Sequence, residues 1–164
     1  MLQVSSLKGD NSRWQCSVVC KRKSLMSSWT KISNEISAIL DKDVVLYPFQ
    51  CNKALLFCSN EEEADWVARH NKIMVNNQNE VYLRKWKQNC NFHGKRKFVS
   101  FGGLIEIEGL PFNLWRKEIF KQIGDACGGY LETDYRTENF LSLFATRIKV
   151  KTNDFGLIPE FVDG

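Results

Sequence analysis

The stretch GLIEIEGLPFNLWRKEIFKQIGDACGG, residues 103–129, predicts a strand followed by a helix. Apolar and acidic residues alternate from Leu104 to Glu108, which is the period of a half-buried strand. Gly109-Leu110-Pro111 breaks that strand, and Asn113 is of a type that caps helices. The following helix has one apolar face, formed by Trp115, Ile119, Phe120, Ile123 and Cys127. A strand that leads through a short loop into an amphipathic helix predicts a helix packed on a sheet.

The rest of the chain predicts two units built from such elements. After the helix, residues 130–134 and 143–151 predict two further strands. Residues 14–86 predict strand, helix, strand, strand, helix and a pair of short strands, in which Ser28 caps the first helix and Pro48 stops the second strand. That order is the split βαβ or ferredoxin-like plan, an antiparallel sheet with two helices on one face. We therefore expect an α+β chain with a ferredoxin-like unit over residues 13–87, a basic connector over 88–100, and a βαββ unit over 101–164 that packs on the first.

Size and composition are those of a globular chain. The 164 residues, 43% of them hydrophobic and 12% aromatic, suffice for one domain or two small ones and are too apolar for a disordered chain. No apolar run reaches the length of a membrane span, so we expect an intracellular protein of the nucleus or cytoplasm. The six cysteines are scattered and fall mostly on apolar faces, which indicates reduced core thiols. The net charge of +4 permits an anionic partner without requiring one.

The second unit also carries a family signature. It consists of Ile105–Trp115 (IEIEGLPFNLW), Ile123-Gly124, Gly128-Gly129 and Ala145–Val150 (ATRIKV). Because of this signature, residues 14–150 resemble a plant protein family. The family is a domain of unknown function that is found at the N-terminal end of LINE-type retrotransposon proteins. The resemblance implies a fold like the RNA-recognition motif and a nucleic-acid-binding role. Many members continue into a CCHC zinc knuckle, whose cysteine and histidine spacing this sequence lacks, so the chain resembles a truncated or single-domain member.

RNA-recognition motifs stack bases on aromatic side chains of their two central strands. In the first unit we expect the corresponding positions at Asn52 and Ala54 on one strand and at Ser17 or Val18 on the other. In the second unit the corresponding first-strand position is Glu106. None of these residues is aromatic. The sequence therefore predicts that nucleic acid, if it binds, does not bind in the usual way of that motif.

Basic and aromatic residues are interleaved in the connector and in the strand before it. Basic side chains neutralise phosphates, and aromatic rings stack on unpaired bases. A basic run at the end of the first strand extends this patch if the fold brings it close. The alternative interpretation is a solvated linker, with Trp86 packed in the core. The predicted nucleic-acid-binding residues are Lys21, Arg22, Lys23, Arg84, Lys85, Trp86, Lys87, Phe92, Lys95, Arg96 and Lys97.

The second unit predicts an ionic sheet face that neutralises itself. Glu106 and Glu108 share one side of their strand, and Glu132 and Asp134 share one side of another. In the split βαβ order a basic strand lies between these two, and opposite charges across strands contribute about 0.2–1 kcal/mol for each pair. We therefore expect this face to bind phosphates poorly. The basic residues concerned are Arg147, Lys149 and Lys151.

No motif indicates an enzyme. The sequence has no phosphate-binding loop, no nucleophile elbow and no His-Glu pair at helical spacing. Glu106, Glu108 and Asp134 offer carboxylates to a divalent cation, but neighbouring basic residues compete with that cation. Cys90 and His93 have the spacing of half a zinc site, and no second pair lies nearby in the sequence. We therefore expect no catalytic residue, no metal and no cofactor.

Trp66 lies off the apolar stripe of its predicted helix, so it either packs between the two units or forms an interaction surface. The leading hypothesis is a non-enzymatic, weakly sequence-specific domain of retroelement origin that binds RNA or single-stranded DNA. The alternative is a protein-interaction or assembly module that self-associates without nucleic acid. A third hypothesis is a decaying fragment without function. We expect neither a membrane nor a small-molecule substrate as a partner.

Overall fold

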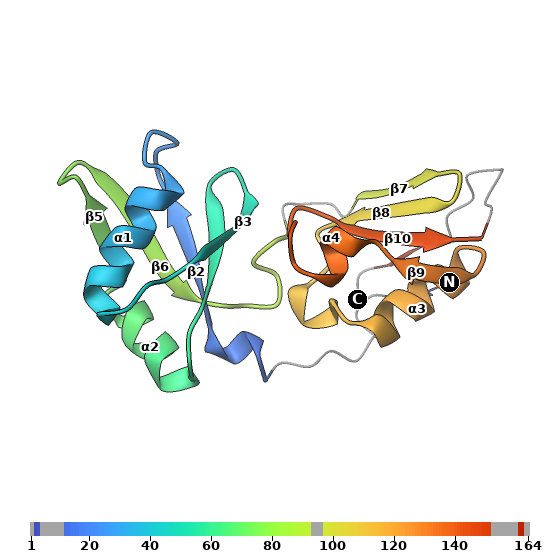
Figure 1. The fold of residues 1–164 in the computed structure, drawn as a ribbon, viewed down its shortest axis with the longest axis horizontal. Coiled ribbons are helices and arrows are strands. Elements are labelled where there is room, and N and C mark those ends of the chain that lie inside the picture. Colours follow the sequence, from blue (N-terminus) through green and yellow to red (C-terminus); the bar gives the residue numbers. More distant parts are fainter. Residues whose placement is uncertain (1, 4–11, 93–96, 152–160, 163–164) are drawn as a thin grey trace. The chain divides into compact units, whose positions relative to one another are not determined.

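The computed structural model describes residues 2–3, 12–92, 97–151 and 161–162 (Figure 1). The chain divides into two compact units, one over Asn11–Cys90 and one that combines Met1–Asp10 with Asn91–Gly164. Each unit contains an antiparallel sheet and helices, which confirms the predicted α+β class. In the described ranges, no helix has both the length and the apolar character that crossing a membrane requires.

The first unit is a five-stranded sheet with two helices. In chain order its elements are β2 (Ser17–Arg22), α1 (Trp29–Leu40), β3 (Leu46–Gln50), β4 (Lys53–Phe57), α2 (Glu61–Arg69), β5 (Lys72–Val75) and β6 (Asn79–Lys85). The strands lie in the order β3-β4-β2-β6-β5, and all neighbours are antiparallel. Without β5, this is the split βαβ order that the sequence predicts. β5 forms a hairpin with β6 and adds the fifth strand.

Both helices of the first unit cover the same face of its sheet (Figure 1). One buried cluster joins Ile32 and Ile36 of α1 to Ala64 and Val67 of α2. It is completed by Val75 of β5 and by alternate residues of β2, β4 and β6, namely Val18, Cys20, Leu56, Val81 and Leu83. Because side chains alternate along a strand, the residues between these face away from the helices.

Both helices begin at capped residues. Ser28 caps α1 as predicted, since its side chain accepts a hydrogen bond from the amide three residues on. Asn60 caps α2 by accepting a hydrogen bond of 2.8 Å from the Glu63 amide. The Glu63 carboxylate lies 2.7 Å from Lys42 Nζ. A hydrogen bond from that lysine is the main cause that holds the pKa of Glu63 below its ordinary value.

Pro48 does not stop the second strand, contrary to the prediction. β3 continues through it from Leu46 to Gln50. β3 lies at the edge of the sheet and has a neighbouring strand on one side only. Edge strands tolerate proline, which has no amide N–H to donate to a neighbouring strand. The register with β4 shifts between Pro48 and Gln50, an irregularity that edge strands tolerate.

The second unit has a four-stranded antiparallel sheet in the order β7-β8-β10-β9. Its elements are β7 (Lys97–Phe101), β8 (Leu104–Glu108), a 3-10 turn (Phe112–Leu114), α3 (Lys117–Ala126), β9 (Tyr130–Thr133), α4 (Tyr135–Glu138) and β10 (Thr146–Val150). In addition, β1 (Leu2–Gln3) pairs in parallel with β11 (Phe161–Val162). β7 lies largely within the predicted connector and pairs with β8 across a turn in which Gly102 has a φ of 61°.

The stretch that predicts the second unit folds as strand, turn and helix. β8 alternates as expected, with its two isoleucines buried. Asn113 does not cap the helix, contrary to the prediction, because it is buried in the 3-10 turn and α3 begins only at Lys117. Trp115 precedes the helix, and its indole Nε1 donates to the Leu110 carbonyl at 2.9 Å. That bond anchors the segment before α3, which moves the start of the helix beyond the predicted cap.

Candidate nucleic-acid interface

The face of the first sheet that the helices leave open is built from alternate residues of its central strands. The register pairs Lys21 of β2 with Lys53 of β4 and with Tyr82 of β6. In the next row on this face, Val19 of β2 pairs with Arg84 of β6. Along each strand, the residues of these two rows alternate with residues that pack in the core under the helices. The side chains of both rows therefore lie on the face opposite the helices. We call this face the open face.

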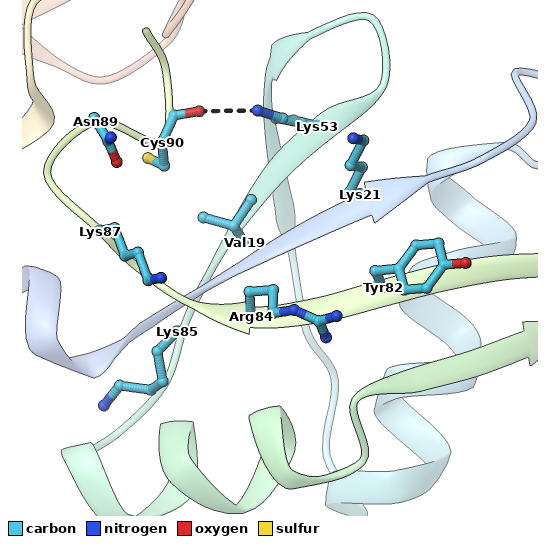
Figure 2. A pocket seen from close by; sticks show the side chains of 9 residues that line it. All are labelled: Val19, Lys21, Lys53, Tyr82, Arg84, Lys85, Lys87, Asn89 and Cys90. Carbon is cyan, nitrogen blue, oxygen red and sulfur yellow. Dashed lines mark hydrogen bonds between the residues drawn. The ribbon is translucent and has the colours of Figure 1, made fainter.

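The chain after β6 turns back beside the open face. The Trp86 amide donates to the Ser17 carbonyl at 3.1 Å, and the Cys90 amide donates to the Lys87 carbonyl at 2.9 Å, which closes a turn. Lys53 Nζ donates to the Cys90 carbonyl at 3.1 Å and ties this turn to β4 (Figure 2). The turn and the strands border a cavity of about 380 Å³, lined by Val19, Lys21, Lys53, Tyr82, Arg84, Lys85, Lys87, Asn89 and Cys90.

The lining of this cavity is basic and contains no carboxylate. One of its lysines is neutralised outside the cavity, because Lys85 Nζ lies 2.9 Å from Asp65 and 3.8 Å from Glu61. Its side chain points toward α2, which carries both acids (Figure 2). The remaining four basic residues are called the cavity cations below, and they are Lys21, Lys53, Arg84 and Lys87.

The cavity cations are held to different extents. Arg84 Nη1 donates to the Asn71 carbonyl at 2.9 Å and also to the side-chain oxygen of Asn71, so its guanidinium is fixed. Lys53 is anchored by its bond to the turn. Lys21 and Lys87 form no ion pair with any other residue that the structure describes. Two cations are therefore oriented by the fold, and two are available to an anion.

Only the first residue of the predicted basic run at the end of β2 joins the cavity. Arg22 is used within the fold: its Nη1 donates to the Ser27 carbonyl at 2.8 Å, and its Cζ lies 4.1 Å from the centre of the Trp29 ring. A nucleic-acid contact of Arg22 stays a prediction. Lys23 Nζ lies 3.7 Å from a carboxylate oxygen of Glu80. Neither side chain lines the cavity, because one supports the loop before α1 and the other faces an acid of β6.

The other predicted residues are placed in three different ways. Trp86 is only 7% exposed, and its ring centroid lies 6.1 Å from that of Trp14. The indole therefore packs in the core, which is the alternative interpretation that the sequence left open for Trp86. Phe92 is partly buried and belongs to the second unit. Lys97 begins β7, and Lys95 and Arg96 lie outside the described residues, so a nucleic-acid contact at these positions stays a prediction.

Of the positions expected to stack bases in the first unit, Val18 and Ala54 were assigned to the wrong face, whereas Ser17 shares the face of Val19. Val18 and Ala54 are fully buried, and both belong to the helix side of the sheet. The central positions of the open face are instead Val19 and Leu55. Both are aliphatic, so this centre carries no aromatic ring, in agreement with the expectation but at different residues.

Sequence reasoning missed Lys53, Tyr82 and Asn89, all of which line the cavity. The signal that finds the first two is cross-strand register, because only the pairing of β4, β2 and β6 brings Lys53 and Tyr82 beside Lys21. Asn89 follows from the turn after β6, whose path no local pattern predicts.

Two of the three basic residues predicted on the ionic face of the second unit have carboxylate partners, as predicted. β10 lies between β8 and β9. Arg147 Nε lies 3.5 Å from Glu106, and Lys149 Nζ donates to Glu132 at 2.8 Å. The hydrogen bond to Glu132 raises the pKa of Lys149. These basic side chains therefore already have carboxylate partners.

Trp66 of α2 is 42% exposed, and its ring centroid lies 4.7 Å from that of His70. Its role as a contact residue stays a prediction. Cys90 lines the basic cavity, and His93 lies outside the described residues. Within the described ranges, no group of three or more His, Cys, Asp or Glu side chains is placed to hold a metal ion.

The resemblance to the plant retroelement family stays a prediction, since neither the fold nor the cavity tests it. Comparison with protein-family models, with curated proteins and with solved structures finds no match for this chain.

Proposed function

We propose that the first unit binds single-stranded nucleic acid, RNA or DNA, through the cavity on its open face, weakly, with little sequence preference and without catalysis. The observation that carries the proposal is the cavity itself, whose lining gathers four cavity cations and no carboxylate. Lysine and arginine neutralise phosphates, and this electrostatic contribution dominates sequence-independent binding. The net charge of +4 is compatible with the same partner. We also propose that the protein acts in the nucleus or the cytoplasm.

The number of cavity cations limits the strength of such binding. Each phosphate neutralised on a single strand contributes about −0.7 to the slope of log K against log salt, so four give at most about −2.8. Binding is therefore measurable at low salt and weak at physiological salt. Sequence preference is small, because the cavity offers bases only one aromatic ring, that of Tyr82, beside the aliphatic Val19.

A titration of fluorescently labelled single-stranded RNA and DNA at several salt concentrations tests the proposal. The double variant Lys21→Gln, Lys87→Gln removes the two cations without an ion pair among the described residues, and we expect the slope to become less steep by about 1.4. Lys31→Gln is the matched control, since Lys31 is an exposed lysine of α1 on the helix side. No binding at low salt, or an equal effect of the control, contradicts the proposal.

A second candidate function is binding to a protein partner or self-association. The observation behind it is that the second unit exposes four large apolar side chains, which contact with a partner would bury. They are Leu131 (57% exposed), Tyr135 (69%), Leu141 (64%) and Phe144 (54%). Sedimentation velocity at several protein concentrations separates the two functions. Dimerisation that the oligonucleotide does not alter supports the second, and a monomer at all concentrations contradicts self-association.

A further inference from the structure

The basic cavity has the size of a site for one small group. Its volume of about 380 Å³ lies near the lower end of the roughly 300–1,000 Å³ typical of ligand pockets. One wall is the turn at residues 87–90, which Lys53 ties to β4 (Figure 2). A cavity that binds the middle of a nucleic-acid strand needs one opening where the strand enters and another where it leaves. A cavity that binds the end of a nucleic-acid strand, or a single nucleotide, needs only one opening. A cavity that is walled on one side therefore suits a terminal group.

The hydrogen-bond donors of the cavity are positioned in advance. Arg84 is fixed by its bonds from Nη1 to Asn71, and its Nε and Nη2 have no partner among the described residues. The ammonium of Lys53 has three N–H groups, of which the turn uses one. The Tyr82 hydroxyl donates to Glu80 at 2.8 Å, which holds the ring beside the cavity. Several hydrogen-bond donors of the lining side chains are therefore left unused by the described part of the fold.

We infer that this cavity is a phosphomonoester site, which takes the terminal phosphate of a nucleic-acid strand or of a free nucleotide. The inference rests on the proposed function, because it gives the same cavity a narrower ligand. A terminal phosphate carries about −1.5 to −2 charges at pH 7 and three oxygens that accept hydrogen bonds, whereas a phosphodiester carries a single charge. Four cations that line one cavity therefore favour the terminal phosphate over an internal one. Tyr82 and Val19 lie beside it, where a sugar or base follows the phosphate.

The test titrates the full chain with one labelled oligonucleotide in three forms: with a 5′-phosphate, with a 3′-phosphate, and with hydroxyl groups at both ends. We expect the fully hydroxylated form to bind about tenfold more weakly than the better phosphorylated form, because it lacks the additional charge. Adenosine monophosphate, with adenosine as its control, tests the free nucleotide. Lys21→Gln should reduce the preference for the phosphorylated form and leaves the bond between Lys53 and the turn in place. Lys31→Gln should keep that preference.

The outcomes separate this inference from the proposed function. If all three forms bind equally, with the expected salt dependence, and adenosine monophosphate does not bind, the phosphomonoester site is overturned and the proposed function stands. If adenosine monophosphate binds and no oligonucleotide does, the cavity is a phosphomonoester site for free nucleotides and the proposed function fails. If no phosphate-containing probe binds, both fail.

Discussion

Arg22 tests which basic residues hold the fold and which are free to bind a ligand. Its Nη1 donates to the Ser27 carbonyl at 2.8 Å in a part-buried position. Its Nε and Nη2 both reach the exposed carbonyl of Cys51, and its guanidinium lies over the ring of Trp29 at 4.1 Å. These contacts join the end of β2 to the β3–β4 turn and to the start of α1. We therefore expect substitution of Arg22 to destabilise the first unit without weakening nucleic-acid binding.

The size of the effect follows from the individual contacts. A hydrogen bond from a charged donor contributes about 1.5–3 kcal/mol, which applies to the part-buried bond to Ser27. The contact with Trp29 adds about 0.5–1 kcal/mol. Water replaces the exposed contacts with Cys51, which therefore contribute little. Arg22→Ala should lower the free energy of unfolding of the first unit by about 2–4 kcal/mol. Arg22→Lys keeps the charge but loses the planar fork, so it should restore only about half of that loss.

Urea unfolding of the full chain, followed by tryptophan fluorescence, measures the change. The signal reports mainly on the first unit, which contains four of the five tryptophans, Trp14, Trp29, Trp66 and Trp86. Lys31→Ala is the control for the loss of a positive charge at an exposed site. We expect its free energy of unfolding to stay within about 0.5 kcal/mol of the original protein.

The salt titration on the same variants decides between a structural and a binding role. The slope of log K against log salt should be unchanged in Arg22→Ala and Arg22→Lys. The reasoning is refuted if Arg22→Ala keeps the stability of the original protein. It is also refuted if the slope becomes less steep by about 0.7 in Arg22→Ala and recovers in Arg22→Lys, because one phosphate contact produces that result.

Three further predictions concern packing, pH and thiol chemistry. Gly124→Ala places a Cβ 2.8 Å from the Cβ of Tyr130 and 3.0 Å from its Cα, so overpacking should destabilise the second unit by about 1–3 kcal/mol. Thermal unfolding followed by circular dichroism measures this change, and an unchanged melting temperature contradicts the prediction. The lowered pKa of Glu63 means that its contribution to stability is present above its unfolded pKa of about 4.3 and is lost as the pH falls through its folded pKa. Glu63→Gln should therefore lose less stability than the original protein between pH 6 and pH 3 in urea unfolding, and equal losses would argue against the ion pair. Burial raises the pKa of Cys20 to about 12, whereas Cys51 is exposed, so iodoacetamide should alkylate Cys51 long before Cys20. Mass spectrometry at several times after treatment gives the order of alkylation, and the reverse order is inconsistent with this fold.

Local patterns in the sequence were sufficient for the order of helices and strands in the first unit, whereas β7 and α4 of the second unit were not predicted. The alternation in Leu104–Glu108 and the helical spacing of apolar residues are properties of neighbouring positions, and the structure contains both elements. The cap at Ser28 is equally local. Patterns of this kind failed where the surroundings decided the result. Pro48 continues its strand because that strand lies at a sheet edge, and Asn113 is not the cap because the segment before α3 is anchored by a buried indole.

The sequence by itself determined the α+β class, the split βαβ order of the first unit and the self-neutralising charges of the second. Only the tertiary structure decided which basic residues are left for a ligand. Register brings Lys53 beside Lys21, and the acids of α2 neutralise Lys85. Contacts with a loop and a ring commit Arg22 to the fold, although it is the direct neighbour of Lys21. The physical reason is that secondary structure depends on residues within a few positions, whereas exposure and charge pairing depend on residues that only folding brings together.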